Sequence, residues 1–430
     1  MRPLIPSETA LVLGGGGAKG AYEIGAIDAL EEMGIRAGSV FGTSVGALNA
    51  SMYAQGTMDK AARLWENIRL SDVVNEDRLS LGDDAEAIFD HPEKLLEFLK
   101  NNAQQKGLDI SPFVEILNRM VDEDAIRRST IRFGLVTTKF PSLSMVEKRL
   151  EDMEPGSLKS WLLASASCFP LFPMAQIGND RYIDGGYCDN APVDMAVRSG
   201  ARHIIAIDIG KHRSHSHYDR RPNVTYIRTA HPLGRMLAFD PELSARNRIL
   251  GYNDTLRAFG HLRGTLYAFD PLDAQALYGR AQDFIIRLTA LETDLQGSNA
   301  LTRRDSSAPI FSLLEEDLPP KADVIDYFLR CCELCAQIAQ INPAQILTFG
   351  TLRDELRAHL PLEKAESMIG SLLGGRVGAL LTKPALDRRL IIACLYQLIL
   401  REGTTFPLAM RTLATFPKEM LCALTLREIL

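Results

Sequence analysis

Short apolar runs alternate with helix-like segments through the first half of the chain. The run Ala10–Leu13 predicts a buried strand, and Ala21–Met33 follows it with apolar residues at helical spacing. The same alternation predicts a helix at Val45–Tyr53 and further strands at Val40–Phe41, Arg132–Thr138, His203–Asp208 and Val224–Ile227. Such alternation is typical of a mostly parallel sheet with helices on both faces. We therefore predict an α/β domain over residues 1–260, with a polar, helical insertion at 54–130.

Beyond about Leu250 the strand pattern stops and only helical periodicity remains. Helices are predicted at Lys321–Ile341, Leu352–His359, Glu363–Leu373 and Leu386–Arg401. The stretch Gly297–Pro320 is rich in polar and helix-breaking residues and is a candidate linker. Residues 261–430 are therefore predicted to form an α-helical C-terminal region, whose role the sequence does not define.

Composition narrows the class of protein. The 430 residues carry 48 Lys+Arg against 54 Asp+Glu, a formal net charge of −6, and 46% are hydrophobic. These values exclude a disordered or collagen-like chain, and the acidic total gives no support to nucleic-acid binding. Seven cysteines, an odd number, favour thiols in a reducing compartment. Because we find neither an N-terminal apolar signal nor the ~20 apolar residues that span a bilayer, we expect a soluble, cytoplasmic protein.

The pentapeptide Gly42-Thr43-Ser44-Val45-Gly46 has the form G-x-S-x-G and stands between a predicted strand and a predicted helix. A nucleophile elbow strains the backbone at its serine, and small residues two positions before and after let the turn close. The helix N-terminus behind the serine adds a partial positive charge for a developing oxyanion. Ser44 is therefore the candidate nucleophile.

A second glycine-rich segment also lies between a predicted strand and a predicted helix; it contains Gly15, Gly16, Gly17, Ala18, Lys19 and Gly20. Glycines let backbone N–H groups surround an anionic oxygen, as an oxyanion hole for acyl transfer requires. The segment also fits the G-x-G-x-x-G of dinucleotide-binding folds. Its following acids, Asp28, Glu31 and Glu32, come earlier than the roughly 20 residues that such a fold requires. A third interpretation is a tight turn that only packs a helix on the sheet.

Asp184 is followed by Gly185 and Gly186, and then by Asn190 and Pro192. We expect this aspartate to lie in a loop, where no neighbouring side chain blocks its approach to a partner. A serine nucleophile needs a base, and none of the eight histidines lies in an obvious catalytic frame. Asp184 is therefore the candidate partner of Ser44.

Two groups of potential metal ligands have simpler interpretations. His212, His215 and His217 form H-x-x-H-x-H in a polar stretch that has no matching carboxylate or cysteine cluster, which favours a solvated loop. Cys331, Cys332 and Cys335 lie on a helix with apolar periodicity, which favours packing. We expect no metal and no cofactor.

The ordered set GGGAKG, GTSVG and DGG with a trailing N-x-P resembles the patatin-like phospholipase family, as a bacterial-type member with a C-terminal helical extension. The resemblance covers residues 8–230 and implies a three-layer α/β/α domain with a Ser–Asp dyad. It implies that Ser44 is the nucleophile, Asp184 the base and the glycine segment the oxyanion hole, while Asn190 and Pro192 match the loop after the aspartate. The stretch Ala164–Pro170 resembles the family's A-S-x-x-x-P region, but its spacing leaves open which serine corresponds.

The resemblance implies a serine acyl hydrolase that cleaves lipid esters as a phospholipase A or lysophospholipase through an acyl-enzyme. Two alternatives remain: an acyltransferase using the same dyad, and a dinucleotide-binding oxidoreductase using the glycine segment. The expected partner is a lipid or another acyl ester. The basic residues Lys211, Arg213, Arg220, Arg221 and Arg228 are candidates for peripheral membrane contact, against the simpler interpretation of a solvated loop. Oligomeric state is not predicted.

Overall fold

The computed structural model describes residues 4–75, 107–210, 214–218, 221–297, 311–315, 318, 321–371, 387–402 and 416–430. Contacts within the chain divide it into two compact units, Met1–Ala258 and Phe259–Leu430. Most of the candidate linker and residues 76–106 of the candidate insertion lie outside the described residues.

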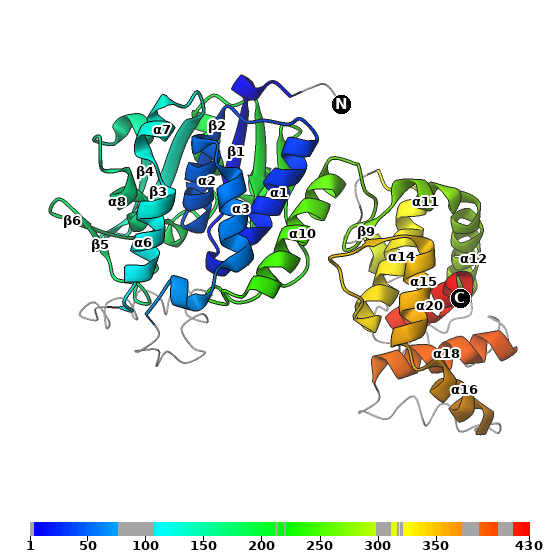
Figure 1. Cartoon of the computed structure of the whole chain (residues 1–430). Coiled ribbons are helices and arrows are strands. Elements are labelled where there is room, and N and C mark those ends of the chain that lie inside the picture. The colour runs from blue at the N-terminus through cyan, green and yellow to red at the C-terminus, as the bar shows by residue number, and fades with distance from the viewer. Residues whose placement is uncertain are drawn as a thin grey trace. The chain divides into compact units, whose positions relative to one another are not determined.

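An eight-stranded mixed sheet forms the centre of the first unit (Figure 1). Its order is β5-β6-β3-β2-β1-β7-β8, with β4 paired to β3. The strands are β1 (Thr9–Leu13), β2 (Ser39–Thr43), β3 (Arg132–Phe140), β4 (Ser144–Arg149), β5 (Ala175–Ile177), β6 (Asp180–Asp184), β7 (His203–Ile207) and β8 (Val224–Ile227). The five strands β3, β2, β1, β7 and β8 run parallel, whereas β4, β5 and β6 join by antiparallel pairing.

Helices cover both faces of this sheet. On one face, α9 (Val193–Arg198) packs against alternate residues of the central strands, including Val12, Phe41 and Ala206. Leu11 and Leu13 alternate to the opposite face and are buried as well. Figure 1 shows helices of the first unit in front of the strands. The helices of the first unit other than α9 are α1 (Ala21–Glu32), α2 (Val45–Gln55), α3 (Met58–Asn67), α6 (Ser111–Met120), α7 (Glu123–Arg128), α8 (Leu158–Ser165) and α10 (Pro241–Ala258).

The pairing register of β3 brings two strand ends together. One edge of β3 pairs with β4 over Gly134–Lys139, so β2 and β6 share the other edge. There Thr43, the last residue of β2, pairs with Val136, and Asp184, the last residue of β6, pairs with Thr137. Because these partners are consecutive residues of β3, the antiparallel β6 ends beside the end of β2.

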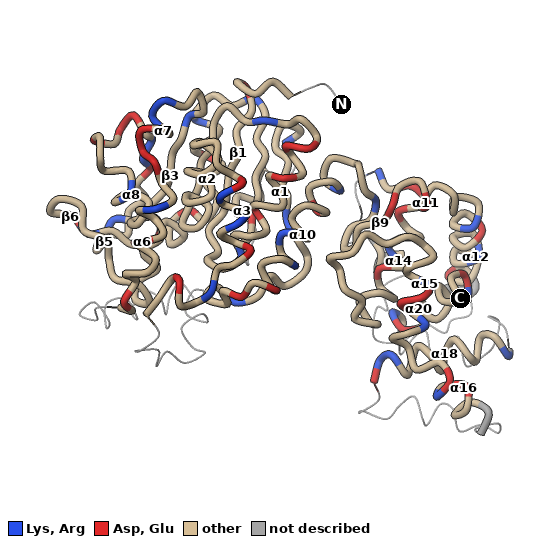
Figure 2. Tube along the Cα trace, viewed as in Figure 1, with Lys and Arg blue, Asp and Glu red and all other residues tan. Residues whose placement is uncertain are grey.

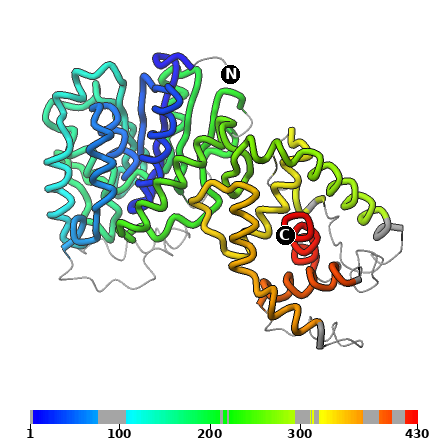
Figure 3. The backbone as a smooth tube through the Cα atoms, turned by 45° about the vertical axis from the view of Figure 1, so that its right-hand side comes forward, coloured from blue at the N-terminus to red at the C-terminus, as the bar shows by residue number. Residues whose placement is uncertain are grey.

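The second unit is helical with its own core. Its helices are α11 (Pro271–Ala276), α12 (Tyr278–Gly297), α13 (Ser312–Glu315), α14 (Val324–Ala339), α15 (Phe349–His359), α16 (Leu362–Ser371), α18 (Arg388–Glu402) and α20 (Pro417–Ile429). The core includes Phe328, Leu352, Ile392 and Leu421, and α20 lies against α18 (Figure 3). Within the described ranges, no helix combines the length and the apolar character needed to cross a bilayer.

The predicted α/β fold with a helical C-terminal region is confirmed, and three expectations need correction. Asp184 does not lie in a loop, because it is the last residue of β6. The strands β4, β5 and β6 were not predicted, since their half-exposed residues lack a buried apolar run. Two-residue strands β9 (Ala268–Phe269) and β10 (Ile346–Leu347) pair in parallel in the second unit, where no strand was expected.

Candidate active site

Ser44 occupies a strained turn between β2 and α2. Its backbone has φ 55° and ψ −126°, a conformation that non-glycine residues rarely adopt. A Cβ on Gly42 would lie 2.4 Å from the Gly46 carbonyl carbon and oxygen, and one on Gly46 would lie 2.3 Å from the Leu13 oxygen. Both flanking glycines are therefore required for the turn to close, as a nucleophile elbow demands.

Asp184 accepts a hydrogen bond from the Ser44 hydroxyl. Ser44 Oγ donates to Asp184 Oδ2 at 2.6 Å, and the backbone N–H of Gly186 donates to Oδ1 at 2.8 Å. Burial raises the pKa of Asp184 to about 6, while the two hydrogen bonds lower it. Neither Ser44 nor Asp184 hydrogen-bonds to a histidine of the described part of the chain. The pair can therefore operate as a nucleophile with a carboxylate base.

The glycine segment lies directly against Ser44. A Cβ on Gly15 would approach the Ser44 Cβ to 3.2 Å. Asn190 holds Gly15 in two directions, since the Gly15 N–H donates to the Asn190 carbonyl at 2.9 Å and Asn190 Nδ2 donates to the Gly15 carbonyl at 3.0 Å. The N–H groups of Gly16 and Gly17 make no backbone hydrogen bond within the described residues. Of the four consecutive glycines 14–17, Gly14 and Gly15 donate to backbone carbonyls, and Gly16 and Gly17 thus retain donors for an oxyanion.

The other residues that the sequence assigns to the site lie in the turns next to Ser44 and Asp184 or at the start of α9. Lys19 and Gly20 belong to a 3-10 turn, Gly17–Gly20, that leads into α1, and a Cβ on Gly20 would lie 2.5 Å from the ring of Trp65. Gly185 packs closely on β3, where a Cβ would lie 2.2 Å from the Val136 oxygen. Pro192 occupies the N-cap position of α9.

Ser165, at the C-terminus of α8, was not assigned by the sequence. Its Oγ accepts the Ser44 N–H at 2.9 Å and donates to the Val136 carbonyl at 2.6 Å. Ser167 instead donates from its Oγ to the Leu163 carbonyl. Ser165 is therefore the serine of the Ala164–Pro170 stretch that holds the backbone of Ser44, and this contact across 121 residues of sequence distinguishes it from Ser167.

An apolar pocket opens beside Ser44 within the first unit. Its lining is almost entirely apolar, which is typical of sites that bind hydrocarbon groups. Ser44, Gly17 and Cys168 stand among its lining residues together with side chains of α2, α3 and α6; these include Leu48, Met52, Trp65, Phe113, Leu117 and Met120. A hydrocarbon chain placed there would start at Ser44.

Charged residues after the glycine segment and among the candidate membrane-contact residues form ion pairs, hydrogen bonds or ring contacts within the first unit. Asp28 pairs with Arg248 at 2.8 Å, and Glu32 accepts a hydrogen bond from Tyr252. Of the candidate membrane-contact residues, Lys211, Arg213 and Arg220 lie outside the described residues, Arg221 stacks on Tyr218, and Arg228 pairs with Asp208. Basic and acidic residues are interleaved along the described helices of both units (Figure 2).

The first unit is similar in sequence to proteins of a known family. Residues 11–197 match the family model "Patatin-like phospholipase". Patatin-like phospholipase domain-containing protein 6 of Mus musculus is 30% identical over 211 residues, covering 49% of this chain and 14% of that protein. Lysophospholipase NTE1 of Scheffersomyces stipitis is 29% identical over 222 residues, covering 49% of this chain and 12% of that protein. The chain therefore carries a patatin-like phospholipase domain, although its match spans only about one seventh of these relatives.

Among solved structures, VipD from Legionella pneumophila aligns over 99% of this chain and 92% of that chain, with 15% identity and a TM-score of 0.40.

Proposed function

We propose that this protein is a serine acyl hydrolase that cleaves lipid esters, as a phospholipase A or lysophospholipase, with Ser44 as nucleophile and Asp184 as base. The observation that carries the proposal is the 2.6 Å hydrogen bond from Ser44 Oγ to Asp184 Oδ2 at a strained elbow beside an apolar pocket. The family of residues 11–197 and the lysophospholipase name of one relative agree with it.

The proposed reaction proceeds in two halves. Asp184 takes the hydroxyl proton while Ser44 Oγ attacks the ester carbonyl, and the Gly16 and Gly17 amides stabilise the oxyanion. The intermediate collapses to an acyl-Ser44 ester and releases the alcohol, which carries away the proton. Asp184 then deprotonates a water that attacks the acyl-enzyme, and the fatty acid leaves as Ser44 recovers its proton. The acyl chain occupies the apolar pocket throughout.

Two alternatives are separable from hydrolysis. Dinucleotide binding is disfavoured, because β2 ends at Thr43 and is followed by Ser44, where such a fold places its ribose-binding acid. Acyl transfer would use the same dyad with an alcohol in place of water, so adding glycerol would divert the product from fatty acid to glyceride.

The test compares Ser44→Ala and Asp184→Asn with Asp180→Asn, a control at the half-exposed start of β6. A fluorophosphonate probe should label Ser44 in the wild type and in the control. Ester hydrolysis should fall below detection in Ser44→Ala and by about 10²–10⁴-fold in Asp184→Asn. Full activity in either dyad variant with an intact fold would refute the mechanism, and comparison of lipid products from wild type and Ser44→Ala would define the substrate.

A further inference from the structure

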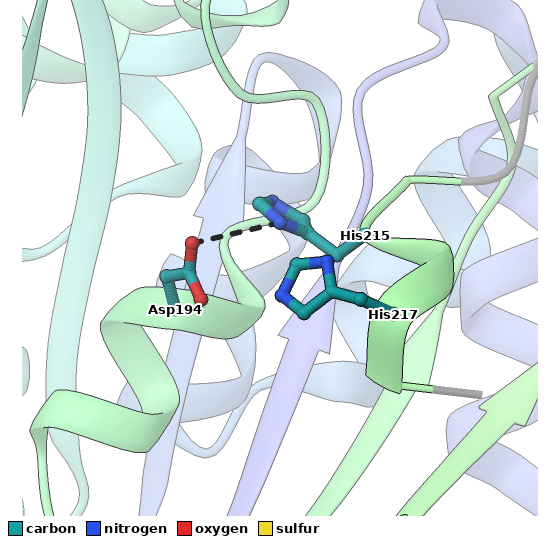
Figure 4. A group of neighbouring side chains, drawn as sticks. All are labelled: Asp194, His215 and His217. Carbon is teal, nitrogen blue, oxygen red and sulfur yellow. Dashed lines mark ion pairs between the residues drawn. The ribbon is translucent and has the colours of Figure 1, made fainter. Parts of the chain in front are cut away.

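Three metal-ligating side chains converge in the first unit, on residues that the proposed reaction does not use. Asp194 comes from α9, while His215 and His217 come from the segment that contains the 3-10 turn Ser216–Tyr218 (Figure 4). One ligand atom from each of the three lies within 4.8 Å of the others. A carboxylate from α9 therefore lies beside two histidines of the H-x-x-H-x-H pattern, whose first histidine, His212, lies outside the described residues.

Two of these side chains, His215 and Asp194, are hydrogen-bonded to residues outside the group of three. His215 Nε2 is hydrogen-bonded at 2.8 Å to Oδ1 of Asp189, whose side chain is 4% exposed, and this bond turns Nδ1 toward Asp194. The Tyr218 hydroxyl donates to Asp194 Oδ1, which leaves Oδ2 directed at His215. A metal-binding histidine almost always donates its other ring N–H to a carboxylate, a backbone carbonyl or a water, and Asp189 is such a partner.

The spacing of the ligand atoms fits a small tetrahedral ion. Bonds of about 2.0–2.1 Å at tetrahedral angles separate the ligand atoms by about 3.4 Å. His215 Nδ1 and Asp194 Oδ2 already lie 3.6 Å apart. His217 is exposed, so its ring can adjust to complete the set. Two imidazoles and one carboxylate are the donor set of zinc sites that keep a water at the fourth position.

We propose that Asp194, His215 and His217 bind one divalent transition-metal ion of the zinc class, with Asp189 and Tyr218 orienting the ligands. Asp189 also connects this site to the dyad, because its carbonyl accepts the Thr43 hydroxyl at 2.9 Å and its N–H donates to the Gly185 carbonyl at 2.9 Å. Its neighbour Asn190 clamps Gly15. A bound ion would therefore stabilise the loop between Asp184 and α9.

Direct titration tests the proposal on the full chain, without a histidine tag and after treatment with a chelator. Zn²⁺ added alone should bind with a stoichiometry of one, measured by calorimetry, and Co²⁺ should give the visible absorption of a tetrahedral site. His217→Ala and Asp194→Asn should each weaken Zn²⁺ binding at least tenfold. His261→Ala, which removes an exposed histidine of the second unit, should leave the affinity unchanged.

A second readout separates loss of a ligand from loss of the fold. With chelator present, His217→Ala should unfold at the same temperature as the wild type, and Zn²⁺ should raise the unfolding temperature of the wild type only. Asp189→Asn should retain one site with an affinity about 10–100-fold weaker. Absence of saturable binding, or equal affinity in His217→Ala and wild type, would overturn the proposal and leave His215 as a partner of two carboxylates. Ester hydrolysis enters none of these measurements, so the outcome is independent of the proposed function.

Discussion

Asp184 has two properties that the proposed base, acting without a histidine, needs. Burial raises the pKa of its carboxyl from 3.8 to about 6, which makes it a stronger base toward the Ser44 hydroxyl while it is still ionised at neutral pH. The hydrogen bonds from Ser44 and Gly186 act in the opposite direction and limit the rise. The same residue should therefore control both the pH dependence of the reaction and part of the stability of the fold.

The first prediction concerns the acid limb of the pH profile. Because only the ionised carboxylate can accept the Ser44 proton, kcat/KM for a neutral ester should fall tenfold per pH unit below an apparent pKa near 6. Initial rates between pH 4 and 9 measure this limb. A limb near the ordinary aspartate pKa of ~3.9 would contradict a buried base.

The second prediction concerns Asp184→Asn. Since the folded-state pKa of Asp184 is about 6 against 3.8 in the unfolded chain, ionisation destabilises the wild type as pH rises through this interval. An asparagine at this position carries no charge and so avoids the cost of burying a carboxylate, and its side-chain oxygen can still accept the hydrogen bond from the Gly186 N–H. The variant should gain up to about 3 kcal/mol in free energy of unfolding at pH 7 and lose the gain near pH 4. Urea unfolding at both pH values measures the difference, and a gain independent of pH would be inconsistent with this cause.

The third prediction separates two neighbouring buried serines. Ser165→Ala leaves the Ser44 N–H without its acceptor and loosens the strained elbow, so kcat should fall roughly 10- to 100-fold with an unchanged fold. Ser167→Ala removes only a local bond to Leu163 and should retain activity. Burst-phase kinetics on both variants provide the comparison. Equal losses would assign Ser165 a purely structural role.

At the scale of elements, continuous apolar runs in the sequence predicted the parallel strands. The sequence did not predict the contacts that depend on the pairing register of the strands. The five parallel strands were predicted because each contains an apolar run, which in Thr9–Leu13 is buried on both faces. Strand β6, with the sequence DRYID, is buried only toward its end, so Asp184 was assigned to a loop. The meeting of Ser44 and Asp184 depends on consecutive partners in β3, and the Asp194–His215 contact depends on how α9 packs. Neither relation has a signal in local spacing.

The fourth prediction concerns α6 and the apolar pocket. Leu117 faces the pocket, so Leu117→Trp should fill space that a long acyl chain would occupy. Hydrolysis of a twelve-carbon ester should fall at least tenfold relative to a four-carbon ester. Asn118→Trp adds the same bulk on the exposed side of α6 and should not alter chain-length preference. An unchanged preference in Leu117→Trp would place the acyl chain elsewhere.

At the scale of the whole molecule, each unit has its own core, and the second unit is also held by a buried polar anchor. In the second unit the anchor is Glu333, which is fully buried on α14. Its Oε1 accepts three consecutive backbone N–H groups, from Thr265, Leu266 and Tyr267, at 2.6–3.0 Å, and its Oε2 accepts the Thr265 hydroxyl. This carboxylate thus links residues 265–267, which precede β9, to helix α14 by hydrogen bonds.

The last prediction uses Glu333 to separate the two units. Glu333→Gln replaces one acceptor oxygen by an NH₂ group that faces a backbone donor or the Thr265 hydroxyl, so the second unit should lose about 2 kcal/mol or more of stability. Glu366→Gln, on the exposed side of α16, should lose none. If the dyad depends on the first unit alone, fluorophosphonate labelling of Ser44 should proceed at the wild-type rate in Glu333→Gln, while calorimetry shows a lower unfolding temperature. A parallel loss of labelling below that temperature would show that Ser44 reactivity requires the second unit.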